Sequence, residues 1–389
     1  MTRFVALCFA IATQFFLITS AQTQTVADLR AHVNREPVTI MTKGIKFPSA
    51  TYMALTSDIT TVLDENEEIR VLPLMGFGAV RNIEDLLYLK GIDTAIMHSD
   101  VLAHLRIINR LPGAESSIKY LARLYDEPFH VIARRPFTDI RQLNDLAVAV
   151  GEAGSDDAMS TETLIALLGI RPQLFYGSSK NNLEKLRSGE VDAMIYPSRA
   201  PSDFVRDLPS GEFYLVPIRP DGRSPDAYEA RILTSEDYPN LIAPGTSVDT
   251  LQFVAVLATY NWQPGTNRYD RVIKFITALF DAREMLKEPG RHPVWQTFDP
   301  MADVPGWTRF APAEELVSKL AVEIANERLK SATQQSIIVH QLNPRTAAEM
   351  ALFVKFLRQR GELARLSDTE VAMRFNNFLQ WRETQEGGR

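Results

Sequence analysis

The sequence predicts an α/β fold of two lobes joined by a hinge of two crossover strands, followed by an all-helical C-terminal extension. Apolar strands alternate with helical stretches through most of the chain, which is typical of a parallel sheet with crossover helices. The stretches "LKGIDTAIMHS" (89–99) and "RSGEVDAMIYPS" (187–198) repeat one pattern. Two further apolar strands, 129–135 and 251–260, enclose the second set of elements and are predicted to cross between the lobes.

The first set of elements predicts a ligand-binding edge. Strands are expected at 37–41, 69–76 and 93–100, with helices after the first two, and Ser49 is a plausible N-cap of the first helix. In parallel sheets, ligands bind beyond the carboxyl ends of the strands. The loop 43–52, the turn 75–80 and the segment His98-Ser99-Asp100 are therefore expected on one rim.

The repeated pattern marks one supersecondary unit in each lobe. In both copies a helix ends at a glycine (Gly91, Gly189), an aspartate follows (Asp93, Asp192), and a buried strand runs to a polar end. We expect the first lobe to comprise 36–135 and 250–312, and the second lobe 136–249. Residues 313–389 contain three helical stretches and no strand pattern, and they form the predicted extension.

The N-terminus is typical of a secretory signal peptide over residues 1–21. Arg3 precedes the apolar run 4–20, and Thr19, Ser20 and Ala21 are small residues suited to cleavage. A retained membrane anchor is the alternative, but the run is short and Thr13 and Gln14 interrupt it. The single cysteine, Cys8, lies inside this segment, so the mature chain is expected to contain no disulfide and no thiolate site.

Composition and motifs argue against several function classes. The formal net charge is −6 and no nucleic-acid-binding motif is present, so no nucleic-acid partner is expected. Of the six histidines only His98 and His104 are close in sequence, and their spacing does not put two metal ligands on one helical face. The chain has no Gly-x-Ser-x-Gly elbow and no phosphate-binding loop. We therefore predict no catalytic residues, no metal and no cofactor.

Several separated blocks resemble the TAXI-type solute receptors of TRAP transporters, which are periplasmic binding proteins of the two-lobed type II kind. The blocks include "TYMALTSDITTVLD", "RVLPLMGFGAVRNIEDLLYLKGIDTAIMHSDVL", "GSDDAMSTETLIALLGI" and "HPVWQTFDPMADVPGWTRFAPAEELV". The resemblance spans residues 36–316 and does not include the C-terminal helices. It implies a periplasmic receptor that closes on a small carboxylate or amino acid, glutamate-like in the common case, and delivers it to membrane permease subunits.

The resemblance also implies where the ligand binds. The matching positions are Thr51 and Tyr52 after the first strand, Gly78 in the second loop, Ser99 and Asp100 after the third strand, and Gly154 and Ser155 opposite. The rim position adds Ser49, His98 and Asp156, and the end of the matching strand in the second lobe adds Tyr196 and Ser198. These residues also have structural interpretations. Tyr52 can belong to the core, and His98 can be a hydrogen-bonded residue of the wall. Ser99, Asp100, Asp156 and Asp157 can instead cap the free N–H groups at the start of a helix.

The first ligand loop departs from the family pattern. Family members have small residues and glycines before Thr-Tyr, whereas this chain has "IKFPSA", and Pro48 has no N–H to donate. Three outcomes remain open. A ligand carboxylate is held by Ser49, Thr51 and a helix N-terminus with Lys43 or Lys46; a zwitterion places its amine on Asp156 or Asp157; or solute binding is lost. The alternative function is an interaction module that regulates a membrane partner such as a sensor, with the C-terminal helices as its contact surface.

Overall fold

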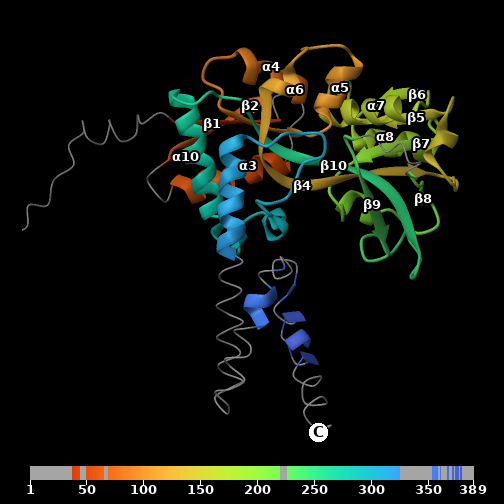
Figure 1. Ribbon diagram of the computed structural model, residues 1–389. Coiled ribbons are helices and arrows are strands. Elements are labelled where there is room, and N and C mark those ends of the chain that lie inside the picture. Colours follow the sequence, from red (N-terminus) through yellow and green to blue (C-terminus); the bar gives the residue numbers. More distant parts are fainter. Residues whose placement is uncertain are drawn as a thin grey trace, which may run out of the picture.

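The computed structural model describes residues 37–43, 50–64, 69–219 and 226–324, together with short pieces between 353 and 378 (Figure 1). The predicted signal peptide with Cys8, the altered loop with Lys46, Phe47 and Pro48, and Ser49 lie outside the described residues. Within the described ranges, no helix combines the length and the apolar character that a membrane crossing requires.

The first lobe is built on three parallel strands with β1 in the middle. The strands are β1 (Val38–Lys43), β2 (Val71–Gly76) and β3 (Thr94–His98). The helices of this part are α3 (Ala50–Asp64), α4 (Ala79–Tyr88), α5 (Val101–Ile107), α6 (Ala114–Ser117) and α10 (Asn267–Asp281). Tyr52, Leu55, Ile59 and Val62 are spaced three or four residues apart and lie on the buried face of α3.

The second lobe repeats the arrangement with β5 in the middle of its parallel strands. The strands are β5 (Ala147–Val150), β6 (Gln173–Tyr176) and β7 (Ala193–Pro197). The helices are α7 (Asp156–Leu168), α8 (Ser179–Ser188) and α9 (Asp203–Arg206). Short elements complete the chain: 3-10 helices η2 (Ile140–Leu143), η3 (Met285–Lys287) and η4 (Pro293–Thr297), and strands β8 (Tyr214–Leu215) and β9 (Glu229–Thr234).

Two long antiparallel strands, β4 (Ile118–Ala133) and β10 (Ser247–Tyr260), connect the lobes (Figure 1). They create the strand order β2-β1-β3-β10-β4-β7-β5-β6. This confirms the predicted two-lobed α/β class with two crossover strands. The lobe boundaries themselves stay a prediction.

The crossover strands are longer than predicted. β4 already begins at Ile118, whereas the predicted strand begins after Pro128. Proline lacks the N–H that a sheet ladder needs and is usually found where pairing changes. Here Pro128 is the last residue of β4 that pairs with β10, opposite Gln252, and Phe129 is the first that pairs with β7. Pro128 therefore marks the position at which β4 passes from one lobe to the other.

The repeated aspartates have matching roles in the two lobes. Asp93 Oδ2 accepts the backbone N–H of Thr39 at the start of β1, at 3.1 Å. Asp192 Oδ2 accepts the N–H of Ala147 at the start of β5, also at 3.1 Å. Each aspartate thus fixes its own strand against the neighbouring strand, and the repeat in the sequence corresponds to a repeat in hydrogen bonding.

The described part of the C-terminal extension begins against the first lobe. Residues 311–324 are helical, and Ala313 and Val317 belong to the same apolar core as α3 and α10. A separate cluster further along the chain contains Val354, Leu357, Leu366, Val371 and Phe375.

Replacement of the two aspartates is expected to have unequal effects. Asp93 is fully buried whereas the Asp192 side chain is 38% exposed, so water replaces the lost bond only at Asp192. Asp93→Ala should lower the free energy of unfolding by about 2–3 kcal/mol, and Asp192→Ala by about 1 kcal/mol. Urea denaturation measures the free energy of unfolding of the two variants. Equal losses in both variants would contradict the unequal effects expected from the burial of Asp93 and the exposure of Asp192.

Candidate functional site

A cavity of about 630 Å3 lies between the lobes at the carboxyl ends of their strands. The first lobe contributes Lys43 at the end of β1 and Thr51 in the first turn of α3, and the crossover strand β4 contributes Tyr125 and Glu127. The second lobe provides most of the wall, from the residues that follow β5, β6 and β7. This is the place where parallel α/β sheets hold their ligands.

Two helix N-termini of the second lobe open at this wall. Ser155 caps α7 by accepting the N–H of Ala158 at 3.1 Å, and Ser178 caps α8 by accepting the N–H of Asn181 at 3.4 Å. Both serines line the cavity. Their positions combine hydroxyl groups with the partial positive charge of two helix starts.

Two glycines of the wall were not identified from the sequence. A Cβ on Gly151 would lie 2.7 Å from the Ala158 nitrogen, and a Cβ on Gly177 would lie 2.6 Å from Asn182 Oδ1. Both distances are too short for a side chain, so these strand ends require glycine. The signal was present as a glycine directly after each apolar strand, in "AVAVG" and "LFYG".

The charged centre of the cavity is one lysine among three carboxyl groups. Lys43 Nζ lies 2.8 Å from Asp157 Oδ1 and 4.0 Å from Asp156 Oδ2, and 5.7 Å from the centre of the Tyr52 ring. Burial alone would lower the pKa of Lys43, but Asp157, Asp156 and Glu127 together raise it above its ordinary value. Lys43 is therefore an ammonium group that is already paired across the lobes.

Glu127 is the third carboxyl group, and Lys43 and a hydrogen bond with Tyr125 partly offset its charge. It is 6% exposed, and burial raises its pKa to about 7 although Lys43 acts in the opposite direction. Its Oε1 atom accepts no hydrogen bond from the described residues. Nε2 of His98 lies 3.7 Å from this atom, which is beyond hydrogen-bonding distance.

Asp156 joins the lobes instead of lining the cavity. Its Oδ1 atom accepts the backbone N–H of Ala79, the first residue of α4, at 2.7 Å. Gly78 precedes it with φ of +120°, and a Cβ there would lie 2.9 Å from Asp156 Oδ1. Gly78 is thus required both for its backbone conformation and for the approach of the carboxylate from the other lobe.

The lobes also meet along a buried polar seam between α5 and α7, which lie side by side in Figure 1. Ser160 donates to Asp100 Oδ1 at 3.0 Å, and the Tyr228 hydroxyl donates to Asp100 Oδ2 at 3.1 Å. His98 Nδ1 lies 2.9 Å from the Ser160 oxygen. Because the hydroxyl hydrogen of Ser160 is used by Asp100, we assign Nδ1 of His98 as the donor to Ser160.

His98 contacts both a serine and a carboxyl group, as a catalytic histidine does. However, His98 and Ser160 are both 0% exposed, and neither lines the cavity. Burial lowers the pKa of His98 well below its ordinary value, with Lys43 adding to the effect, so the ring is neutral. A substrate has no access to the pair in this closed arrangement, and we interpret it as part of the lobe contact.

The structure divides the predicted site residues into groups. Those that line the cavity are Thr51, Ser155, Tyr196 and Ser198. Those in the contacts between the lobes are Gly78, His98 and Asp156. Tyr52 is buried in the first-lobe core, Ser99 bonds to the Val254 backbone, and Gly154 lies in the exposed turn before α7.

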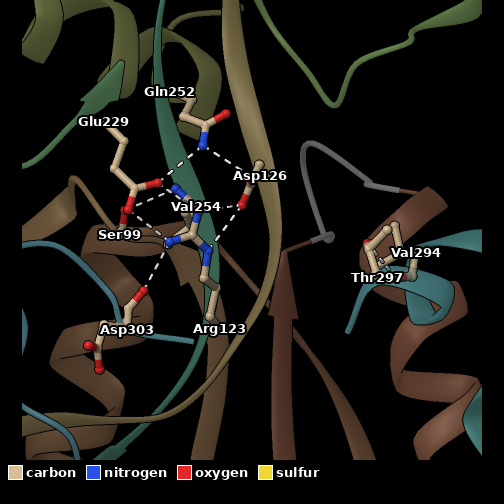
Figure 2. A network of polar contacts seen from close by, with 9 residues as sticks. All are labelled: Ser99, Arg123, Asp126, Glu229, Gln252, Val254, Val294, Thr297 and Asp303. Atoms are coloured by element: carbon tan, nitrogen blue, oxygen red, sulfur yellow. Dashed lines mark hydrogen bonds and ion pairs between the residues drawn. The ribbon is translucent and has the colours of Figure 1, made fainter. Parts of the chain in front are cut away.

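A second cavity of about 580 Å3 lies beside the crossover strands and shares Tyr125 and Arg199 with the first. On one side Arg123 pairs with Asp126 at 2.7 Å and with Glu229 at 2.6 Å, and Gln252 donates to both carboxylates (Figure 2). Val294 and Thr297 of η4 lie across from this network (Figure 2). The network links β4, β9 and β10, and the sequence interpretation did not identify it.

The described residues contain no group of three or more His, Cys, Asp or Glu side chains arranged to hold a metal ion.

Comparison with known proteins gives one family and a set of structures. Residues 48–220 match the model of the NMT1-like family. No curated protein matches the chain. The finer assignment to TAXI-type receptors stays a prediction.

Several solved structures of ligand-binding domains are similar to the chain. The GluR0 ligand-binding core of Nostoc punctiforme with L-glutamate has 11% identity and a TM-score of 0.39, over 67% of this chain and 96% of that one. The periplasmic VFT2 domain of Bordetella pertussis BvgS has 11% identity and a TM-score of 0.37, over 66% and 92%. Tv2483 bound to L-arginine has 12% identity and a TM-score of 0.38, over 67% and 90%.

Removal of the Asp156 carboxylate should open the lobes. Asp156→Ala removes the bond to Ala79 and one of the charges near Lys43, so small-angle X-ray scattering should show a larger radius of gyration. Asp203→Ala is the control, because it removes the same charge from a side chain that is 84% exposed. An unchanged radius in Asp156→Ala would show that this contact does not hold the lobes together.

The seam should make stability depend on pH through Asp100. Burial raises the pKa of Asp100 to about 7, whereas an unfolded aspartate has a pKa of about 3.9. The folded state holds the proton between these values, so this contribution to the free energy of unfolding falls as pH rises from about 4 and is lost above about 7. Urea denaturation measures the change in the free energy of unfolding between about pH 6.5 and about pH 8, and this change should be more positive for Asp100→Asn than for the wild type.

The histidines act in the opposite sense over this window, because an unfolded histidine has a pKa of about 6.5 and burial lowers the pKa of folded His98 and His104. This contribution is common to the wild type and the variant, so the difference between the two proteins reports Asp100. Asp203→Asn is the exposed control and should keep the wild-type change. An Asp100→Asn protein with the wild-type change would remove Asp100 as a source of the pH dependence.

Proposed function

We propose that this protein is a periplasmic solute receptor that closes its two lobes on a small organic acid or amino acid and delivers it to membrane permease subunits of the TRAP type. The observation that carries the proposal is the cavity of about 630 Å3 at the strand ends of both lobes. Its volume falls in the range of about 300–1,000 Å3 that is usual for small-molecule sites. The two crossover strands supply the geometry of a hinge.

The lining supports recognition of a polar solute. Thr51, Ser155, Ser178, Ser179 and Ser198 offer hydroxyl groups, and Tyr125, Tyr196 and Phe204 offer aromatic surface. A mainly preformed cavity with a few polar groups is typical of orienting sites for small molecules. The ion pair of Lys43 with Asp157 argues against Lys43 as the receiver of a ligand carboxylate.

A second candidate function is supported by the lobe contacts. Asp156 bonds to Ala79, Lys43 pairs with Asp157, and Ser160 bonds to Asp100, so protein groups of one lobe bind directly to those of the other. This arrangement favours a receptor-like interaction module that regulates a membrane partner such as a sensor. The contact surface would then include the C-terminal helices.

Thermal unfolding of the mature chain, residues 22–389, with a panel of amino acids and mono- and dicarboxylates tests the two candidates. A solute at a hundredfold excess over its dissociation constant stabilises a receptor by about 2.7 kcal/mol, which raises the melting temperature by a measurable amount. Thr51→Ala, in the wall of the cavity, should reduce the shift.

The matched control is Thr297→Ala, which lies in the wall of the second cavity and should leave the shift unchanged. A folded protein that no solute stabilises would overturn the receptor function and favour the interaction module.

A further inference from the structure

We infer that the cleft selects solutes that carry an amino group, and that the carboxyl group of Glu127 on the crossover strand β4 receives that group. The inference rests on the proposed receptor function and names the chemical class of its ligand. The ligand would be an amine or an amino-acid-like zwitterion, and an analogue without the amine would bind weakly.

The first support is the charge balance of the cavity wall. Its described lining contains two cationic side chains, Lys43 and Arg199, and four carboxyl groups, Glu127, Glu152, Asp157 and Asp203. Glu152 and Asp203 are exposed, so the charge balance of the inner wall is that of Lys43 against Glu127 and Asp157. This balance favours a ligand that brings positive charge, because like charges in a partly buried space repel one another. A dicarboxylate would add to the excess of negative charge.

The second support is the distribution of hydrogen bonds. Lys43 Nζ already donates a hydrogen bond to Asp157 Oδ1 at 2.8 Å, and Asp156 Oδ1 already accepts one from the Ala79 N–H at 2.7 Å. Glu127 keeps an Oε1 atom with no hydrogen-bond partner among the described residues, although it is buried and lines the cavity. A buried acceptor without a donor is unfavourable, and an ammonium group supplies three donors.

The third support is the aromatic surface around Glu127. Tyr125, Tyr196 and Phe204 line the same cavity, and the rings of Tyr196 and Phe204 lie 4.7 Å apart. Aromatic faces attract cations through their quadrupole. Acidic and aromatic groups in one wall are complementary to an organic ammonium ion. Arg199 forms no ion pair with the described residues and is available to the carboxylate of a zwitterion.

A proton competes with the ligand for Glu127. The groups that face it are Lys43 from β1, Tyr52 from α3, His98 from β3, Tyr125 from β4, Tyr196 from β7, and Asp156 and Asp157 from α7. Burial raises the pKa of Glu127 to about 7, so the empty site is partly protonated at neutral pH. An ammonium ligand displaces this proton, and its affinity should rise as pH increases from about 6 to about 8.

Isothermal titration with matched pairs tests the inference. The pairs are L-glutamate and glutarate, L-leucine and isocaproate, and putrescine and butanediol. In any pair that binds, the member with the amine should bind about tenfold more tightly or better, which corresponds to about 1.4 kcal/mol. Glu127→Gln should remove most of this preference and the pH dependence, while affinity for the member without the amine changes little.

The control is Glu190→Gln, the same change at an exposed side chain outside the cavity, which should keep wild-type affinity. If no solute of any pair binds to the folded protein, the receptor function itself fails. If solutes bind without preference for the amine, the receptor function stands and the inference is overturned. An equal loss of affinity for both members in Glu127→Gln would also overturn it, because Glu127 would then act only through the fold.

Discussion

The pairing of β4 with β10 is the constraint on which the rest of the structure depends. Each strand serves both lobes: β10 pairs with β3 in the first lobe, and β4 changes its partner from β10 to β7 at Pro128. The strand ends of both lobes therefore face one space, and β4 itself places Tyr125 and Glu127 in the wall of that space. The Arg123 network links β4 to β9 and β10 beside this wall.

The arrangement of the strands also determines which charged side chains meet where the two lobes touch. The N-terminus of α7 brings Asp156 and Asp157 to the end of β1, where Lys43 is the cation that meets them. One cation cannot neutralise three carboxyl groups. Burial raises the pKa of Asp156 and of Glu127, and the attraction of Lys43 offsets this only in part. The groups that hold the lobes together thus leave uncompensated negative charge in the cavity between them. In the proposed receptor, closure of the lobes and selection of the ligand depend on the same charged groups.

Much of the fold is predictable because its signals are local. Strand and helix alternation, the Gly-Asp repeat and the apolar crossover strands all follow from residues near one another in sequence, and Asp93 and Asp192 have the matching roles that the repeat indicates. The site is less predictable because its contacts join distant segments. Nothing near Asp156 in the sequence indicates that its partner is Ala79, or that Lys43 pairs with Asp157. Glu127 was not predicted because a charged residue before a proline is typical of a loop, whereas here it lies inside a central strand.

We propose that a solute draws the two lobes together across the hinge. The distance between two spin labels, one on each lobe, measures this movement directly. Cys8 is the only cysteine and belongs to the predicted signal peptide, so cysteines introduced at the exposed positions Ser57 in α3 and Lys180 in α8 would be the only labelling sites of the mature chain. Pulsed electron paramagnetic resonance should show the distribution of distances shift to shorter and narrower values when an amine-bearing solute is added. A distribution that stays the same in the presence of every solute tested would contradict the account.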